Sequence, residues 1–250
     1  MVKIKYNGST IASLEAGQTA RLHTKDTSLD GDIIITVPAD MGGNEGGEEG
    51  LAAGLYETGT TTLIKSWDEL LAEGVVHVED GVVFTNYYYD EDEDEDINTS
   101  ASVLAGDLVL PDGIITLNRY AFACCFKLQG VVIPDSVTSI GSSAFYACSL
   151  RSIAFGENSQ LTSIGDRAFD TSGLTSITIP DSVTEIGSYA FSWSSLTSIT
   201  FKGTPSEISD DIFEECDHLS TINAPWAEGE VANAPWGAEN ATINYNYTGE

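Results

Sequence analysis

The sequence predicts a mainly β protein in which a small all-β module and a Gly-rich linker precede a capped solenoid of about five short repeats. Three observations support this prediction. An Ala-Phe or Ile-Phe pair recurs at steps of 23, 24, 22 and 22 residues, an apolar frame that begins with Leu follows each pair, and the first 37 residues contain short alternating segments. A repeat of this length cannot bury its apolar face alone, so the copies must stack on one another.

The predicted repeats span residues 104–224, and each contains one strand-like frame. From the Leu after each Phe, apolar residues fall at positions i, i+3 and i+5, which is the L-x-x-L-x-L frame of a leucine-rich repeat. Small polar residues alternate with the last two apolar ones, and this alternation predicts a half-buried strand. Stacking such strands about 4.8 Å apart gives a continuous core. The frames are Leu128-Val131-Ile133, Leu150-Ile153-Phe155, Leu174-Ile177-Ile179, Leu196-Ile199-Phe201 and Leu219-Ile222-Ala224.

The segments between frames predict how each repeat turns. Pro-Asp-Ser-Val-Thr-Ser-Ile-Gly at 134–141 and its near copy at 180–187 form a corner, because proline cannot donate a hydrogen bond to the next repeat. The glycines that close the corners predict turns with positive φ. The Ala-Phe pair then begins a predicted helical turn that places its Phe in the core. An insertion at 155–161 and a displaced proline at 201–205 predict irregular loops on one flank.

The first 54 residues differ in composition from the repeats. Residues 1–37 predict a module of about four strands, with Asn7-Gly8 as the turn of the first hairpin. Residues 38–54 contain six glycines in seventeen positions and predict a flexible acidic linker. The four expected strands are Lys3–Tyr6, Thr10–Leu14, Thr19–Leu22 and Asp32–Val37.

Solenoids need caps over their open ends, and the sequence offers two candidates. Residues 55–103 predict an N-terminal cap with an acidic loop: an amphipathic helix over Leu63–Ala72, followed by strands at Val75–Val78 and Val82–Phe84. Residues 225–250 predict a C-terminal cap, in which two Ala-Pro-Trp motifs cover the last repeat and a final strand at Ala241–Tyr247 extends the sheet.

Composition excludes several function classes. Ten Lys and Arg residues stand against 39 Asp and Glu residues, for a formal charge of −29, so the clustered cations that nucleic acid or an anionic membrane surface would need are missing. No segment approaches the roughly 18 apolar residues of a membrane span. The N-terminus shows no apolar run typical of a secretory signal, so an unprocessed chain is expected. We expect neither a nucleic-acid partner nor membrane insertion.

No pattern of catalytic or metal-binding residues emerges, so the prediction is a non-enzymatic protein without a cofactor. His23, His77 and His218 lie in three separate regions and accompany no nucleophile, phosphate-binding or zinc-binding motif. The acidic run Asp90–Asp96 lacks the Gly and Glu positions of an EF-hand loop, and it is interpreted as a solvated loop, with weak calcium binding left as an alternative.

The cysteines also favour a structural role. Three of them, Cys125, Cys148 and Cys216, lie three residues after the repeat Phe, where Ser172 and Ser194 stand in the other repeats. A small buried side chain explains this spacing better than a metal or redox site, which would need convergent thiolates and partners. Cys124 lies outside this position and is expected at the surface.

Candidate binding residues fall into three groups. The solvent-facing side of the predicted sheet carries small polar residues, and a plain solvated sheet is an equal alternative. Trp193 stands at a variable position of the repeat, which predicts an exposed indole that forms one patch with Tyr189. Three tyrosines beside the acidic run form a second aromatic patch suited to a sugar or a protein, and packing within a cap is the alternative for both patches. The remaining members are Ser176, Thr178, Ser198 and Thr200 on the sheet, and Tyr87, Tyr88 and Tyr89 in the second patch.

The unit L-x-x-I-x-I-P-D-S-V-T-x-I-G-x-x-A-F resembles the BspA type of leucine-rich repeat, which occurs in bacterial surface proteins, some protist proteins and phage or prophage proteins. Residues 4–20 are similar to an N-terminal module of phage tail-associated proteins, and residues 225–238 to tails that follow such repeats in phage-encoded proteins. These resemblances imply a bacteriophage virion protein, associated with the tail or a fibre and assembled in the host cytoplasm.

The partners that these resemblances imply differ between the two ends of the chain. The N-terminal module would bind other phage structural proteins, and the repeats would bind a host cell-surface protein or glycan. Self-association into a homo-oligomer is left open. The alternatives are a bacterial cell-surface BspA-like adhesin and a structural decoration protein of the virion.

Overall fold

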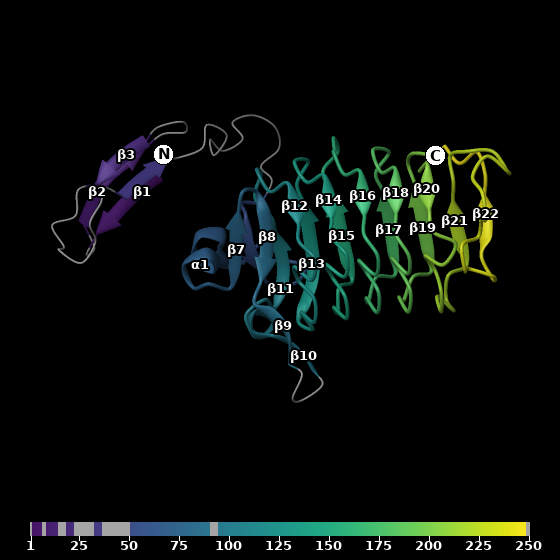
Figure 1. Ribbon diagram of the computed structural model, residues 1–250, viewed down its shortest axis with the longest axis horizontal. Coiled ribbons are helices and arrows are strands. Elements are labelled where there is room, and N and C mark those ends of the chain that lie inside the picture. The colour runs from purple at the N-terminus through teal and green to yellow at the C-terminus, as the bar shows by residue number, and fades with distance from the viewer. Residues whose placement is uncertain are drawn as a thin grey trace. The chain divides into compact units, whose positions relative to one another are not determined.

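The computed structural model describes residues 51–90 and 95–248, together with the backbone of four short strands before them (Figure 1). The chain divides into two compact units, Met1–Gly50 and Leu51–Glu250. In the first unit, strands form where the alternating segments predict them, in two antiparallel pairs. The predicted linker residues 38–50 lie outside the described residues. The strands are β1 (Val2–Tyr6), β2 (Ser9–Leu14), β3 (Thr19–Leu22) and β4 (Ile33–Thr36).

The second unit is the predicted solenoid, built from rungs that contain a main strand, a short corner strand and a turn leg, and only the sixth rung has no corner strand among the described residues (Figure 1). Six rungs stack, one more than the five frames predict, because β11 and β12 form a rung ahead of the first frame. The main strands are β11 (Gly106–Val109), β13 (Leu128–Ile133), β15 (Ser152–Phe155), β17 (Ser176–Ile179), β19 (Ser198–Phe201) and β21 (Thr221–Asn223). The corner strands are β12 (Thr116–Leu117), β14 (Ser139–Ile140), β16 (Ser163–Ile164), β18 (Glu185–Ile186) and β20 (Glu207–Ile208).

Corner strands of successive rungs pair in parallel, and so do the main strands except β15 and β17. All five corner strands belong to one sheet of seven strands, completed by β8 (Val82–Thr85) and β7 (Val76–Glu79) of the N-terminal cap. The main strands instead form two sheets: β15, β13 and β11 belong to one, and β17, β19 and β21 belong to the other. The main face of the solenoid is therefore interrupted between its third and fourth rungs.

Each turn leg is a series of turns and not the helical turn that the Ala-Phe pair predicts. In the first rung the Ala121 and Ala123 amides donate to the carbonyls three residues earlier, and the intervening amides donate along the solenoid, from Phe122 to Ala144 at 2.7 Å. Tyr120 adopts a φ of +58°. In a helix the amides would donate hydrogen bonds within their own rung, whereas in alternating turns half of the amides donate to carbonyls of the next rung.

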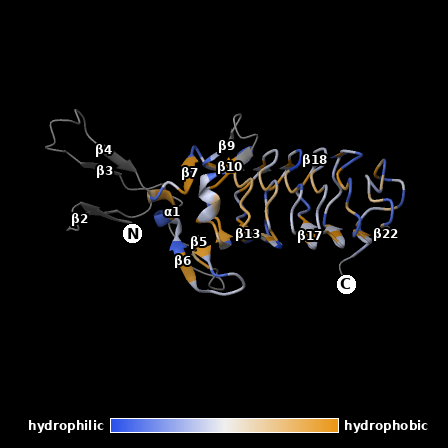
Figure 2. Cartoon of the chain, turned by 90° about the horizontal axis from the view of Figure 1, so that it is seen from below, coloured by the Kyte–Doolittle hydropathy of each residue, from blue (hydrophilic) through white to orange (hydrophobic). Residues whose placement is uncertain are grey.

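Two columns of side chains run through the core, one formed by the Phe of successive rungs and one by the Leu. Phe122, Phe145, Phe169, Phe191 and Phe213 are fully buried, and consecutive rings stack with centroids 5.4, 5.4, 5.5 and 5.9 Å apart. The Leu of every frame is buried beside them. Figure 2 shows the hydrophobic residues recurring from rung to rung along the solenoid. The repeat period of the sequence thus becomes a continuous apolar column.

The N-terminal cap is more β-rich than predicted. β5 (Gly54–Tyr56) begins within the range predicted as linker and pairs antiparallel with β11, and β6 (Leu63–Ser66) pairs with β5. The expected helix over Leu63–Ala72 is therefore shorter: α1 spans Trp67–Ala72. It begins there because the Ser66 hydroxyl accepts a hydrogen bond from the Glu69 amide, while the Glu69 carboxylate accepts one from Ser66 N.

A hairpin and the C-terminal cap complete the second unit. The hairpin of β9 (Tyr87–Asp90) and β10 (Glu95–Asn98) projects from one side of the solenoid (Figure 1), and the short 3-10 helix η1 (Thr99–Ser102) follows. At the other end, β22 (Thr242–Asn244) extends the main sheet in parallel with β21, within the range predicted for a final strand. Within the residues described, no helix is long and apolar enough to cross a membrane.

Candidate functional site: an aromatic row on the turn legs

The turn legs hold four side chains in the same backbone conformation, one on each of four successive rungs. Tyr120, Ser143, Arg167 and Tyr189 have φ values of +58°, +56°, +54° and +58°. Residues other than glycine rarely adopt this left-handed conformation. Here the inter-rung hydrogen bonds impose it, since the amides of the first three residues donate to the next rung. The repeat therefore aligns these four positions along the solenoid.

Aromatic and guanidinium groups meet at the N-terminal end of this line. The Tyr87 ring, from β9, stacks on Tyr120 with centroids 4.5 Å apart and an interplanar angle of 18°. The Arg119 guanidinium lies 4.7 Å from the centre of the Tyr120 ring, and its Nη2 donates a 3.0 Å hydrogen bond to the Tyr120 hydroxyl. Such contacts keep a cation over an aromatic face.

A shallow cleft lies beside these rings. Its volume is about 230 Å³, and its lining consists of three tyrosines, one serine and one arginine: Tyr87, Tyr120, Tyr146, Ser143 and Arg167. We call the line formed by Tyr87, Tyr120, Tyr146, Arg167 and Tyr189 the aromatic row. Polar hydroxyl and guanidinium groups and apolar ring faces are both available in the row, which suits contact with a ligand that has both kinds of surface.

Arg167 is fixed within the aromatic row by two contacts. Its guanidinium lies 4.8 Å from the centre of the Tyr189 ring, and its Nη1 donates a 3.0 Å charged hydrogen bond to Asp170 Oδ2. The Asp170 side chain is buried, and its second oxygen accepts a hydrogen bond from Thr171. The guanidinium is about half exposed, so it presents a positioned cation on a protein whose formal charge is −29.

The predicted aromatic residues are only partly brought together. Tyr87 and Tyr189 belong to the aromatic row, whereas Trp193 occupies a second left-handed position of the turn leg and is 63 % exposed, as predicted. Tyr189 packs against Arg167 of the preceding rung. Tyr88 and Tyr89 lie on β9, opposite Ile97 and Asp96 of β10, and their side chains lie outside the described residues.

Sequence reasoning missed Tyr120, Tyr146, Arg119 and Arg167. The repeat register contained the necessary information, because Tyr120, Arg167 and Tyr189 stand two residues before the Phe of their rungs. What the sequence could not show is that the distant Tyr87 stacks at the end of the line.

The sheet-face candidates lie on the outer face of β17 and β19, as the alternation predicts. Ser176 and Thr178 are exposed, and Ser198 and Thr200 are partly exposed. The Thr200 hydroxyl accepts a 3.0 Å hydrogen bond from the Asn223 amide on the next rung. This face offers hydroxyl groups without large aromatic side chains, so the aromatic row has the richer set of contacts.

The cysteines confirm the predicted structural position. Cys125, Cys148 and Cys216 are buried, as are Ser172 and Ser194. The Cys148 thiol donates a 2.9 Å hydrogen bond to the Phe122 carbonyl, and Cys216 makes the equivalent bond to Phe191 at 3.0 Å. No group of three potential metal ligands occurs among the residues that the structure describes, and residues 91–94 of the acidic run lie outside them.

The expectation of an exposed Cys124 is wrong. Cys124 is only 4 % exposed because the N-terminal cap covers the first turn leg. The buried Asn98 side chain, at the end of β10, donates hydrogen bonds of 2.8 Å to the Ala123 carbonyl and to the Thr85 hydroxyl. The repeat alone gave no information about this covering.

Because the thiols are buried, we expect the free energy of unfolding to fall at high pH. Burial removes the hydration that a thiolate needs and raises the pKa of Cys148 to about 12. An unfolded thiol titrates near pH 8.5, so this contribution is present below that pH and is lost as the pH rises through about 12. Denaturant unfolding between pH 7.5 and 10.5 should therefore show a smaller decline in the free energy of unfolding for Cys148→Ser than for the native chain. Identical pH dependence in the two proteins would contradict the assignment.

The stacked frames and parallel strands define a leucine-rich repeat solenoid, a class that typically serves as a non-enzymatic binding scaffold. Residues 109–232 match the family model of the BspA type Leucine rich repeat region in six copies. The repeats of this chain are therefore similar to the BspA type over slightly less than half of the chain. The matched range covers the main strands from the end of β11 through β21.

Solved structures with a similar fold include a leucine-rich repeat protein from Eubacterium ventriosum, which is 25% identical with a TM-score of 0.48 over 58% of this chain and 40% of that chain. A leucine rich repeat protein of T. pallidum is 26% identical with a TM-score of 0.46, over 64% and 78% of the two chains. The chain thus spans two fifths of the Eubacterium chain. No curated protein matches the chain.

Proposed function

We propose that this chain is a non-enzymatic recognition protein of the BspA-like adhesin kind, whose repeat domain binds a cell-surface glycan or protein at the aromatic row. The observation that supports this function best is the positioned Arg167 guanidinium, which lines the cleft together with Tyr146 and lies over the Tyr189 ring. Ring faces offer apolar contact to the C–H faces of a sugar or to an apolar side chain, and the guanidinium pairs with a carboxylate or sulfate. We therefore expect an anionic ligand with an apolar face.

Solenoid stacking supports a display role because it makes the aromatic row rigid. Tyr120, Ser143 and Arg167 are each attached to the next rung by a main-chain hydrogen bond of 2.8–3.1 Å, so their spacing does not depend on a flexible loop. Preorganised contacts lose less conformational entropy on binding. Several copies on one surface would increase the apparent affinity through avidity.

Substitutions in the aromatic row should test the ligand site. Tyr120→Ala and Arg167→Gln should each weaken binding of the full chain to an array of sialylated and uronic-acid glycans about tenfold, which corresponds to ~1.4 kcal/mol. Phe126→Ala removes a ring that is 60 % exposed outside the row and serves as the matched control. Equal loss in all three variants, or none in the first two, would rule out the aromatic row as the site.

A separate experiment tests whether the protein is displayed on the bacterial envelope or on virus particles. The bacteriophage role predicted from the two ends of the chain gains no support from the comparisons, whereas the adhesin is compatible with the repeat family. Gold-labelled antibodies to residues 104–224 should bind the bacterial envelope if the adhesin proposal holds. Gold on virus particles would overturn it in favour of the virion protein. In that case, deletion of residues 1–37 should remove the protein from particles and leave the repeats folded.

A further inference from the structure

The repeat residues of the aromatic row, with Ser143 between them, occupy two positions of the turn leg: two residues before the repeat Phe and directly after it. The first position carries Tyr120, Ser143, Arg167 and Tyr189, and the second carries Tyr146. The Phe rings of these four rungs stack with centroids 5.4, 5.4 and 5.5 Å apart. The row therefore runs in the stacking direction and advances by about this distance at each rung.

The cleft beside the row runs in the same direction. Its lining begins at Tyr87 of β9 and Tyr120 of the first rung, includes Ser143 and Tyr146 of the second rung, and reaches Arg167 of the third. A ligand that follows this lining crosses successive rungs. An extended chain suits such a surface, because each rung offers contacts to the next unit of the chain.

Two guanidinium groups lie along this line, two rungs apart. Arg167 belongs to the third rung and is about half exposed. Arg119 is exposed beside the row on the first rung, where its guanidinium lies 4.7 Å from the centre of the Tyr120 ring. Guanidinium groups form strong charged hydrogen bonds with carboxylates. A chain with one unit on each rung would therefore meet a partner for a carboxylate at every second unit.

The row is bounded at both ends. On the fifth rung its two positions carry Asp211, which is partly exposed, and Glu214, which is exposed. Two carboxylates at these positions repel an anionic ligand. At the other end, the hairpin covers the first rung, since the Tyr87 ring stacks on Tyr120. The length available to an anionic chain is therefore four rungs.

We propose that the aromatic row binds a linear glycan with a carboxylate on every second sugar, as an extended chain along the solenoid with one sugar on each of four rungs. A pyranose in an extended chain advances by about the spacing of the rungs, so the register is kept. One carboxylate would pair with Arg119 and the next with Arg167, and neutral sugars would lie at Ser143 and Tyr189. This inference rests on the function proposed above and specifies the form of the ligand.

Hyaluronan oligosaccharides, in which glucuronic acid alternates with N-acetylglucosamine, provide the first test. In calorimetric titrations of the full chain, the tetrasaccharide should bind at least tenfold more tightly than the disaccharide, and the hexasaccharide at most about twofold more tightly than the tetrasaccharide. Equal affinity of the disaccharide and the tetrasaccharide would overturn the inference.

The same titrations separate this inference from the proposed function. If a glycan with one terminal sialic acid bound at the row and no hyaluronan oligosaccharide did, the recognition site would stand and the extended chain would be refuted. If no anionic glycan bound, the proposed function would fail together with the inference.

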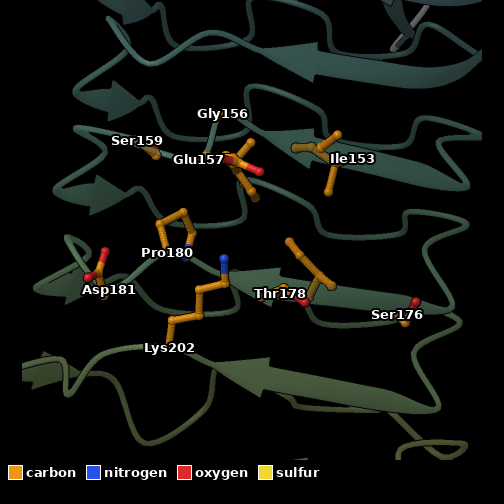
Figure 3. Close-up of a pocket in the computed structure, with 12 residues that line it drawn as sticks. Ile153, Gly156, Glu157, Ser159, Ser176, Thr178, Pro180, Asp181 and Lys202 are labelled. Carbon is orange, nitrogen blue, oxygen red and sulfur yellow. The ribbon is translucent and has the colours of Figure 1, made fainter. Parts of the chain in front are cut away.

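The two-cation register is tested by substitution. Arg119→Gln and Arg167→Gln should each weaken tetrasaccharide binding about tenfold, because each removes the partner of one carboxylate. Lys202→Gln is the matched control, since it removes the same charge outside the row: the Lys202 side chain lies in a second cleft, of about 240 Å³, where it extends toward Pro180 (Figure 3). Equal losses in all three variants, or a loss in Arg167→Gln alone, would overturn the register.

Removing the acidic end of the row should lengthen the site. In the double variant Asp211→Asn, Glu214→Gln, we expect the hexasaccharide to bind at least fivefold more tightly than the tetrasaccharide. The control variant Glu157→Gln, Asp181→Asn removes two carboxylates from the second cleft and should keep the preference of the native chain (Figure 3). The same hexasaccharide preference in both variants would contradict the four-rung length.

Discussion

Phe169→Ala is expected to destabilise the repeat domain by about 3–5 kcal/mol, the range for deleting a large buried aromatic side chain. Phe169 is fully buried and stacks on Phe145 and Phe191 with centroids 5.4 and 5.5 Å away. The main-chain hydrogen bonds between neighbouring rungs prevent the turn leg from collapsing into the space left behind. Equilibrium unfolding in urea, followed by circular dichroism, measures the change.

Phe126 supplies the control for this substitution. Its ring is 60 % exposed, so Phe126→Ala should change the free energy of unfolding by less than about 0.5 kcal/mol. A similar effect of the two substitutions would show that the Phe column does not stabilise the solenoid.

Trp236→Ala is expected to cost a similar ~3–5 kcal/mol and to promote aggregation. Trp236 is 1 % exposed and lies 6.1 and 6.4 Å, between ring centroids, from Phe201 and Phe213. Without the indole, the last Phe of the column would face solvent at the open end of the solenoid, and terminal repeats need a cap for solubility.

Trp193 is the matched control for the cap, because its indole is 63 % exposed. Trp193→Ala should leave both the unfolding midpoint and the sedimentation profile unchanged. If Trp236→Ala also left the unfolding midpoint and the sedimentation profile unchanged, the C-terminal segment would not act as a cap.

The sequence predicted the parts of the fold that depend on period. The positions of Phe145, Leu150 and Cys148 within each repeat follow from one rule, burial on stacking, and that rule applies equally to every rung. The repeat period could not predict the backbone conformation of the turn legs, because an Ala-Phe pair is compatible with both a helical turn and alternating turns. The choice depends on main-chain bonds to the neighbouring rung, such as Phe122 N to the Ala144 carbonyl.

The features that depend on distant contacts were less predictable. Leu63 and Ile64 fit a helix by composition, yet their segment pairs with β5 as a strand. The stack of Tyr87 on Tyr120 joins residues from the hairpin and the first rung, so no local pattern indicates it. The insertion at 155–161 was visible as an irregularity, but its effect on the pairing of β15 required knowledge of the bonds to Asp135.

The seven-stranded corner sheet has a mechanical consequence. It runs without interruption past the rungs whose main strands are separated, through the pairing of Ile164 with Ile186. Any movement that changes the distance between β15 and β17 therefore rotates the two halves of the solenoid about this sheet, which acts as the hinge. Because the lever arm is several rungs long, a small change at β15 and β17 becomes a larger displacement at both caps, so the curvature of the whole rod depends on one loop.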